Sequence, residues 1–298
     1  MITAMVTPMR EDGSVDYEQA GRLANALLDS GSDGILVSGT TGESPTLSAE
    51  EKLRLITEVK SAIGARGAVM AGTSSYNTAE SVALSRKAEQ RGADALLLVS
   101  GYYNRPGQEG LYRHFKAIAE AVSIPCMLYN VPSRTVVNLE PETVIRLAEI
   151  DNIVGVKEAS GNLGQIARII EGTPDDFRVW SGNDGDTFLV LCLGGYGVVS
   201  VASHLVGQQI KAMMRLFLMG QVTAAADMHR RLLPLFQIMF VATNPQPIKW
   251  ALDHVGFRVG NPRLPLLGLG EFDEVAAAKV QDVLAGYGIN LPVSAATR

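Results

Sequence analysis

The sequence is poor in the residues that build metal centres, disulfide frameworks and nucleic-acid surfaces. Its 298 residues include two cysteines and four histidines, charged residues make up 19%, and the formal net charge is -5. The histidines lie far apart and show no metal-ligand spacing. A net negative chain offers no basic field to nucleic acid or to an anionic membrane. We therefore expect no metal site, no nucleic-acid partner and no membrane partner.

The sequence also lacks the segments that direct a chain to or across a membrane. Residues 1–8 have neither the basic start nor the apolar core of a signal peptide. No apolar run approaches the length that spans a bilayer. Cys126 and Cys192 both stand among apolar residues, so we expect two buried, reduced thiols. Together these features predict a cytoplasmic protein.

Hydrophobic residues, at 47%, and 30 glycines are plentiful, and apolar runs alternate with helical patterns. The runs expected to form buried strands are residues 2–6, 34–38, 68–72, 94–99, 125–129, 153–157, 178–181 and 197–201. Continuously apolar strands separated by helices indicate a parallel sheet covered by helices. Eight such units predict an α/β fold of the (β/α)8 TIM-barrel type, and a doubly wound sheet is the alternative.

Helical patterns fill the gaps between these strands and dominate the end of the chain. Ser48 with Glu51 forms a capping-box pattern, and Asn77 with Glu80 predicts a second helix start. Further helices are expected at residues 17–28, 49–63, 110–121, 141–148, 163–170, 208–240, 247–254 and 274–284. We therefore predict a catalytic barrel over residues 1–224 and a C-terminal helical appendage over residues 225–298.

Lys157 stands at the end of the sixth predicted strand, where packing does not explain it. Lysine is rarely buried unless it is paired, and burial of an unpaired charge is costly. Such a site favours the neutral amine, which is a nucleophile. We therefore expect Lys157 to form a Schiff base with a carbonyl substrate. The alternative is a solvated lysine just beyond the strand end.

Other polar residues follow the strands at the same predicted end of the barrel, where active sites of this fold lie. Residues 39–44 (GTTGES) present two threonine hydroxyls and flexible backbone amides that suit a carboxylate, although they also fit an ordinary turn. Residues 101–106 and 129–135 carry tyrosines, whose phenols can pass protons or simply pack. Arg134 can bind a carboxylate or form a surface ion pair. Asn183 or Asp184 can cap the helix after the seventh strand.

Four of these segments together resemble one family. They are residues 39–44, 102–106, 129–135 and 156–162, and residues 243–245 extend the likeness into the C-terminal part. The chain resembles the 4-hydroxy-tetrahydrodipicolinate synthases, also called dihydrodipicolinate synthases, over almost its whole length. The lysine and the first loop are shared with the wider superfamily of pyruvate-dependent class I aldolases, which includes N-acetylneuraminate lyase. Arg134 in its Val-Pro-Ser-Arg-Thr setting narrows the resemblance to the synthases.

The resemblance implies that pyruvate condenses with L-aspartate 4-semialdehyde to give 4-hydroxy-tetrahydrodipicolinate, for lysine and diaminopimelate biosynthesis. It implies a homotetramer that needs no metal or organic cofactor. Pyruvate would attach to the lysine, and a tyrosine from a neighbouring subunit would complete a proton relay. The implied catalytic residues are Lys157, Tyr129, Thr40 and Tyr103, and the implied substrate-binding residues are Thr41, Arg134, Gly182 and Val199.

Six further positions correspond to those that bind lysine in the family's lysine-inhibited members. The chain resembles those members at Ser44, Glu80 and Tyr102 and departs from them at Ala49, Lys52 and Tyr76, where they tend to carry histidine or asparagine. A lysine side chain at position 52 would repel a cationic effector. We therefore predict that free lysine inhibits this protein weakly or not at all.

Two other functions stay open from the sequence. A sugar-acid aldolase of the same superfamily would cleave its substrate to pyruvate, but Arg134 disfavours this because such substrates present hydroxyls there. A catalytically inactive barrel that acts as a binding protein would have lost the lysine or the tyrosine pair, and both are present.

Overall fold

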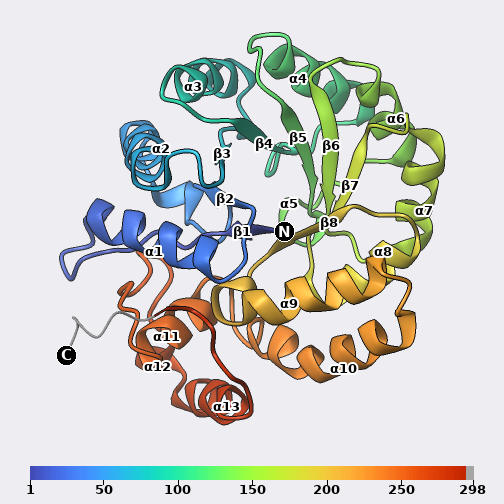
Figure 1. Ribbon diagram of the computed structural model, residues 1–298. Helices are drawn as coiled ribbons and strands as arrows, with labels where there is room; N and C mark the ends of the chain where they lie inside the picture. The colour runs from blue at the N-terminus through green and yellow to red at the C-terminus, as the bar shows by residue number, and fades with distance from the viewer. Residues whose placement is uncertain (293–298) are drawn as a thin grey trace. The chain divides into compact units, whose positions relative to one another are not determined.

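The computed structural model describes residues 1–292, and its eight strands form a closed parallel barrel in the order β1 to β8 (Figure 1). The strands are β1 Ile2–Ala4, β2 Gly34–Val37, β3 Ala68–Gly72, β4 Ala95–Val99, β5 Cys126–Asn130, β6 Ile153–Glu158, β7 Arg178–Ser181 and β8 Gly197–Ser200. The closed barrel confirms the predicted fold class and excludes the doubly wound sheet.

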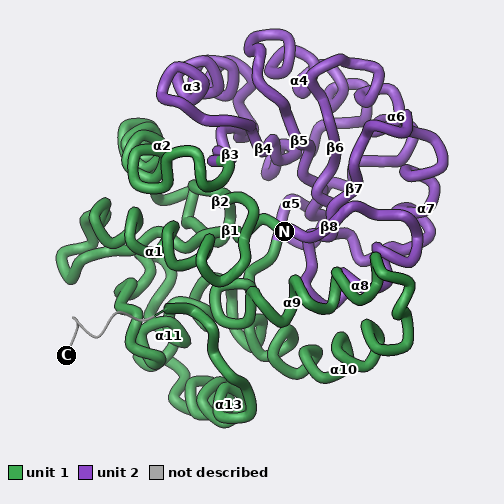
Figure 2. Tube along the Cα trace, viewed as in Figure 1, with its two compact units in different colours: residues 1–68, 200–298 green, residues 69–199 purple. Residues whose placement is uncertain are grey.

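Two compact units make up the chain, and Figure 2 colours them separately. One combines residues 1–68 with residues 200–298, and the other consists of residues 69–199. The predicted division between residues 224 and 225 is a different one and falls inside helix α10 (Val222–Ile238). It stays a prediction.

The unit of residues 69–199 places helices along one face of its strands. Its helices are α3 Thr78–Gln90, α4 Gln108–Ala119, α5 Pro132–Thr135, α6 Pro141–Ala148, α7 Leu163–Gly172, η2 Asp184–Asp186 and α8 Thr187–Cys192. In α4, Leu111, Phe115 and Ile118 recur on one helical face and are fully buried. Figure 1 shows α3, α4, α6 and α7 outside strands β4 to β7.

The register of the strands in this unit decides which side chains share a face. Tyr129 on β5 lies opposite Lys157 on β6, and Asn130 lies opposite Glu158. Successive side chains of a strand point to opposite faces. Tyr129 and Lys157 therefore share one face, and Asn130 and Glu158 share the other.

The unit of residues 1–68 and 200–298 contains β1, β2 and the helices at both ends of the chain. Its helices are α1 Tyr17–Asp29, η1 Ser44–Thr46, α2 Ala49–Ile63, α9 Ser203–Leu218, α10 Val222–Ile238, α11 Gln246–His254, α12 Leu269–Phe272 and α13 Glu274–Leu284. The predicted capping box is present, with Ser48 Oγ accepting from Glu51 N at 3.2 Å and Glu51 Oε2 accepting from Ser48 N at 2.8 Å. Helices α9 and α10 pack side by side (Figure 1).

Several predictions made from the sequence need correction. Strand β6 runs on to Glu158, so Lys157 is its penultimate residue rather than its last. The helical stretch 208–240 is two helices, separated where Gly220 takes a φ of 75° that ends α9. Cys192 is exposed rather than buried, whereas Cys126 is buried as expected. Asn183 is at an N-cap position but its side chain makes no capping bond, and its amide nitrogen donates instead to Asp186 Oδ2 at 2.8 Å.

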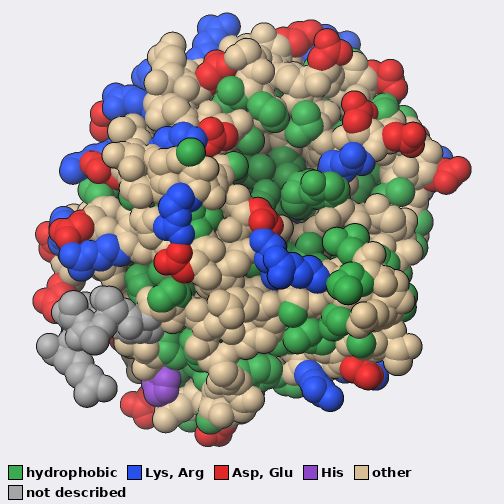
Figure 3. Space-filling view, in the orientation of Figure 1, with side chains coloured by type: hydrophobic (Ala, Val, Ile, Leu, Met, Phe, Trp, Pro, Cys, Tyr) green, Lys and Arg blue, Asp and Glu red, His purple; other side chains and the backbone are tan. Residues whose placement is uncertain are grey.

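Residues 1–292 contain neither a membrane-spanning helix nor a cluster of metal ligands. No helix there is both long enough and apolar enough to cross a membrane. In the same residues, no group of three or more histidine, cysteine, aspartate or glutamate side chains could hold a metal ion. On the face shown in Figure 3, charged side chains lie along the outer helices of residues 69–199, and hydrophobic side chains gather nearer the strands.

Candidate active site

Lys157 is buried on the strand face that it shares with Tyr129. The lysine is 5% exposed and the tyrosine 6%. The Lys157 Nζ lies 4.2 Å from the centroid of the Tyr129 ring. Within residues 1–292 the structure shows no ion pair for Lys157, so the aromatic ring is the neighbour that its amine faces. The solvated-lysine alternative is therefore wrong.

The next residue, Glu158, holds the end of β6 from the opposite face. Its carboxylate accepts from Asn130 Nδ2 at 3.1 Å, from Gln165 Nε2 at 3.1 Å and from the backbone N–H of Ser160 at 2.7 Å. Gln165 belongs to α7, so the carboxylate faces the helices while Lys157 faces away from them. Because its oxygens are occupied by amides on that face, Glu158 is an anchor for the strand rather than a counter-ion for the lysine.

Gly182 lies directly beside Lys157, at the end of β7. Its backbone N–H donates to Glu158 O at 2.7 Å, which continues the β6–β7 pairing. A Cβ added at Gly182 would lie 2.6 Å from Ala159 Cβ and 3.2 Å from Lys157 Cε. Position 182 therefore has no room for a side chain unless the end of β6, which carries Lys157, shifts.

The other candidate residues of this unit lie at or near the ends of their strands. Val199 on β8 is fully buried. Tyr103 is 92% exposed and has a φ of 67°, in the left-handed region. Arg134 is exposed and lies in the short helix α5, which follows β5 directly. Tyr102 packs edge-on against Tyr76 with ring centroids 5.1 Å apart, and burial raises the pKa of Tyr102.

The other unit holds the loop of residues 39–44, which we call the 39–44 loop. Thr40 is partly exposed and Thr41 is buried. The Thr41 Oγ1 accepts a hydrogen bond of 2.9 Å from Asn244 Nδ2. Glu43, the fifth residue of the loop, has a left-handed conformation with φ 58°. Its Oε1 accepts from Lys249 Nζ at 2.7 Å, and both side chains are almost fully buried.

The same unit carries three of the candidate effector residues. Ser44 begins the 3-10 helix η1, Ala49 begins α2, and Lys52 lies one turn further along α2. Burial lowers the pKa of Lys52. The other three, Tyr76, Glu80 and Tyr102, belong to the unit of residues 69–199.

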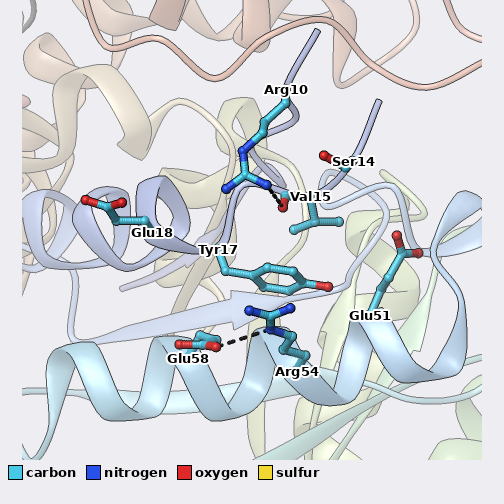
Figure 4. A pocket seen from close by; sticks show the side chains of 8 residues that line it. All are labelled: Arg10, Ser14, Val15, Tyr17, Glu18, Glu51, Arg54 and Glu58. Atoms are coloured by element: carbon cyan, nitrogen blue, oxygen red, sulfur yellow. Dashed lines mark hydrogen bonds and ion pairs between the residues drawn. The ribbon is translucent and has the colours of Figure 1, made fainter. Parts of the chain in front are cut away.

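A surface hollow of about 480 Å³ lies in this unit between the 10–15 segment, α1 and α2 (Figure 4). Figure 4 shows Tyr17 between the guanidinium groups of Arg10 and Arg54, and the Arg54 Cζ is 4.0 Å from the ring centroid. Each carboxylate of the hollow has an arginine partner, through the pairs Glu18–Arg22, Glu51–Arg263 and Glu58–Arg54. The hollow therefore has the character of a solvated ion-pair network and not of a reaction site.

The residues that hold the site in place were not predicted from the sequence. Glu158 and Asn130 stood inside the recognised motifs but were given no role, although two polar residues at the ends of adjacent apolar strands are a usable signal. Lys249 was also missed. It follows Ile248 and lies two residues before Ala251 on a helix whose neighbouring residues are apolar, and a lysine in that setting predicts a buried ion pair.

The fold and the lysine site define a class. The closed parallel barrel carries a buried lysine near the carboxyl end of a strand, and no carboxylate is paired with this lysine within residues 1–292. Such a lysine can react covalently with a carbonyl compound, and the active sites of parallel barrels lie at this end of the strands. This is a (β/α)8-barrel enzyme.

Comparison with known proteins narrows the class to a family. Residues 1–284 match the family model described as the dihydrodipicolinate synthetase family. A 4-hydroxy-tetrahydrodipicolinate synthase from Dehalococcoides mccartyi is 58% identical over 293 residues, which cover 98% of each chain. A dihydrodipicolinate synthase structure from Bacillus anthracis superimposes with a TM-score of 0.93 at 46% identity, covering 96% of this chain and 97% of that one. The enzyme from Cyanidioschyzon merolae, solved with lysine bound, gives a TM-score of 0.93 at 45% identity over 96% of both chains.

The chain belongs to the dihydrodipicolinate synthetase family. The family expected from the sequence motifs is thereby confirmed. Neither the sugar-acid aldolase nor the inactive barrel is favoured by these relatives, which are named as synthases.

Proposed function

We propose that this enzyme joins pyruvate to L-aspartate 4-semialdehyde and releases 4-hydroxy-tetrahydrodipicolinate, for lysine and diaminopimelate biosynthesis. The observation that carries the proposal is the buried amine of Lys157 facing the Tyr129 ring in a member of this family. The relatives named as 4-hydroxy-tetrahydrodipicolinate synthases support the choice of substrates. Free thiols at Cys126 and Cys192 support a cytoplasmic location.

The proposed reaction begins when the neutral Lys157 amine attacks the ketone carbon of pyruvate and water leaves, which forms an imine. The protonated imine withdraws electrons, so a methyl proton of pyruvate is released and an enamine forms. The enamine carbon then attacks the aldehyde carbon, and the aldehyde oxygen takes up a proton. Finally the amino group of the second substrate attacks the imine carbon, closes the ring and expels the lysine amine. Each step moves a proton, so a proton carrier must stand next to the imine.

Tyr129 is the proposed proton carrier at the imine, because its ring is the neighbour of Lys157 Nζ. We propose that Thr40 and Tyr103 extend the relay, with Tyr103 supplied by a neighbouring subunit of a homotetramer. The 92% exposure of Tyr103 supports this, since a tyrosine so exposed in one chain is available to another.

The substrates are proposed to bind through side chains at the strand ends. We assign the pyruvate carboxylate to Thr41 and the carboxylate of the semialdehyde to Arg134, whose planar fork matches a carboxylate. Gly182 and Val199 are proposed to line the pocket. The closeness of position 182 to the lysine, 3.2 Å from an added Cβ to Lys157 Cε, supports its place there.

Feedback by lysine is proposed to be weak or absent. Lys52 places an amine among the candidate effector residues, and a bound lysine would bring a second cation. Initial rates measured with increasing lysine test this. Inhibition at the lysine concentrations found in cells would contradict it, and Lys52→His then identifies whether this residue sets the response.

Reduction with borohydride in the presence of pyruvate tests the proposed function. Borohydride turns the imine into a stable amine, so peptide mass mapping should find the pyruvate-derived mass on Lys157. Lys249, which is also buried, serves as an internal control because its amine is occupied by Glu43. Label on Lys249 or no label at all would reject the proposal. Parallel assays with aspartate semialdehyde and with sugar acids distinguish the synthase from an aldolase.

A further inference from the structure

We propose that Asn244 and Lys249 are positioning residues for the 39–44 loop, and that Asn244 sets the affinity for pyruvate by directing the hydroxyl of Thr41. This inference rests on the proposed function, in which Thr41 binds the pyruvate carboxylate. All the contacts that carry it lie within the unit of residues 1–68 and 200–298.

The Asn244 amide determines how Thr41 can bind an anion. A threonine hydroxyl has one proton to donate and lone pairs that accept. Asn244 Nδ2 donates to Thr41 Oγ1 at 2.9 Å, and both residues are at most 5% exposed. Because Asn244 Nδ2 donates to a lone pair of Thr41 Oγ1, the Thr41 hydroxyl proton points away from Asn244. That proton is therefore available to a carboxylate. Asn244 therefore makes Thr41 a donor in advance of substrate binding.

Lys249 holds the second half of the loop. Its ammonium group has three protons, which are donated to Glu43 Oε1 at 2.7 Å, Thr7 O at 3.0 Å and Asn261 O at 3.1 Å. Thr7 Oγ1 in turn donates to Gly42 O at 2.7 Å. The loop is thus tied to the Lys249 amine directly through the Glu43 carboxylate and indirectly through Thr7, which binds both Gly42 O and the amine.

The backbone of the loop explains why it needs these ties. Ser38 and Glu43 have φ angles of 50° and 58°, in the left-handed region that side chains disfavour. At Gly42 a Cβ would stand 3.1 Å from both Met5 O and Ser38 N, so the loop is already packed closely against the end of β1 and its own start. A loop with this backbone keeps its shape only while its neighbours hold it.

The test measures borohydride trapping of pyruvate as a function of pyruvate concentration, which needs no second substrate. Asn244→Ala should raise the half-saturating pyruvate concentration about fivefold to tenfold, as expected for one lost hydrogen bond, while the maximal trapping rate changes little. Asn244→Asp should raise it further, because its carboxylate would accept the Thr41 proton and repel the pyruvate carboxylate. Gln246→Ala is the matched control, since Gln246 is a buried amide on α11 that donates to Leu267 O.

A double-mutant cycle shows whether Asn244 acts through Thr41. In a Thr41→Val background, which removes the hydroxyl, Asn244→Ala should have no further effect on pyruvate binding. For Lys249 the pair of charges is removed together, as Glu43→Gln with Lys249→Met, because a single change would leave a buried charge unpaired. The pair should fold and should weaken pyruvate binding, whereas Gln246→Ala should not.

The outcomes separate this inference from the proposed function. If wild-type Lys157 is not labelled by pyruvate and borohydride, the proposed function itself fails. If the wild type is labelled but both Asn244 variants keep the wild-type pyruvate dependence, only the positioning inference is overturned. It is also overturned if the Asn244→Ala effect persists unchanged in the Thr41→Val background.

Discussion

Replacing Gly182 by alanine should displace the Lys157 amine without removing any polar group from the site. The added methyl group would stand 2.6 Å from Ala159 Cβ, 3.1 Å from Glu158 O and 3.2 Å from Lys157 Cε. Ala159 Cβ and Glu158 O belong to or sit directly on the backbone that Gly182 N–H binds, so the end of β6 must shift to make room and Lys157 moves with it.

The expected size of the effect follows from these distances. Carbon atoms in ordinary contact lie about 3.5–4.0 Å apart, so the 2.6 Å contact with Ala159 Cβ must lengthen by about 1 Å, and Lys157, two residues before Ala159, is carried along by that shift. Overpacking of this kind costs about 1–3 kcal/mol of folding free energy. A misplacement of about 1 Å at a reacting group can reduce turnover about 100-fold, which corresponds to about 2.7 kcal/mol of activation free energy. We therefore expect Gly182→Ala to reduce kcat and the rate of imine trapping together.

The measurement combines steady-state rates, borohydride trapping with pyruvate and urea unfolding. Gly110→Ala is the control, because Gly110 is exposed within α4 and an alanine there should stabilise the helix slightly. The reasoning is refuted if Gly182→Ala traps pyruvate at the wild-type rate although its unfolding free energy has fallen, since the lysine would then not depend on the space beside this glycine.

Three further predictions concern the proton carrier, acid stability and a helix start. Tyr129→Phe keeps the ring that Lys157 faces but removes the hydroxyl, so imine trapping should persist while kcat falls about 10²- to 10⁴-fold; a kcat within a few-fold of wild type would rule out Tyr129 as the proton carrier. Burial lowers the pKa of His204 from 6.5 to about 4. Between these two pH values the His204 imidazole is therefore protonated in the unfolded chain and neutral in the folded protein. The unfolding free energy should therefore fall by about 3 kcal/mol between pH 6.5 and pH 4, and urea titrations should show a shallower fall for His204→Gln; identical pH profiles of the two proteins would contradict this. Ser48→Ala removes the capping box of α2 and should lower the unfolding free energy by about 1 kcal/mol without changing kcat, and an unchanged urea midpoint would show that Glu51 is held by Arg263 alone.

The sequence predicted best the features that local patterns determine. Helix α6 begins at Pro141 and α13 ends at Leu284 as expected, because a proline at the first helical position and a long apolar periodicity are visible in a few residues. The strand that carries Lys157 begins at Ile153 as expected, although it ends one residue later, since a short, continuous apolar run is typical of a strand that is buried in a parallel sheet.

The contacts that join distant segments could not be predicted in the same way. Glu43 and Lys249 are 206 residues apart, and Thr41 and Asn244 are 203 apart, so no window of sequence shows either pair. The burial predicted for Cys192 was wrong because it rested on the apolar neighbours of this residue in the sequence. Cys192 is the last residue of the short helix α8, and its side chain is exposed there. Patterns of this kind show which residues are apolar, but the packing of remote elements decides which of them are covered.

The alternation along β6 has a consequence for how this family can vary. Lys157 and Glu158 are adjacent, yet the Lys157 side chain lies on the interior face of the barrel, whereas the Glu158 carboxylate binds Gln165 on α7. Deleting or inserting a single residue just ahead of them would exchange the two, leaving a carboxylate inside and an amine among the helices. The number of residues ahead of Lys157 on this strand therefore cannot change by one, and a redesigned barrel must keep Lys157 on the interior face and Glu158 on the helix face.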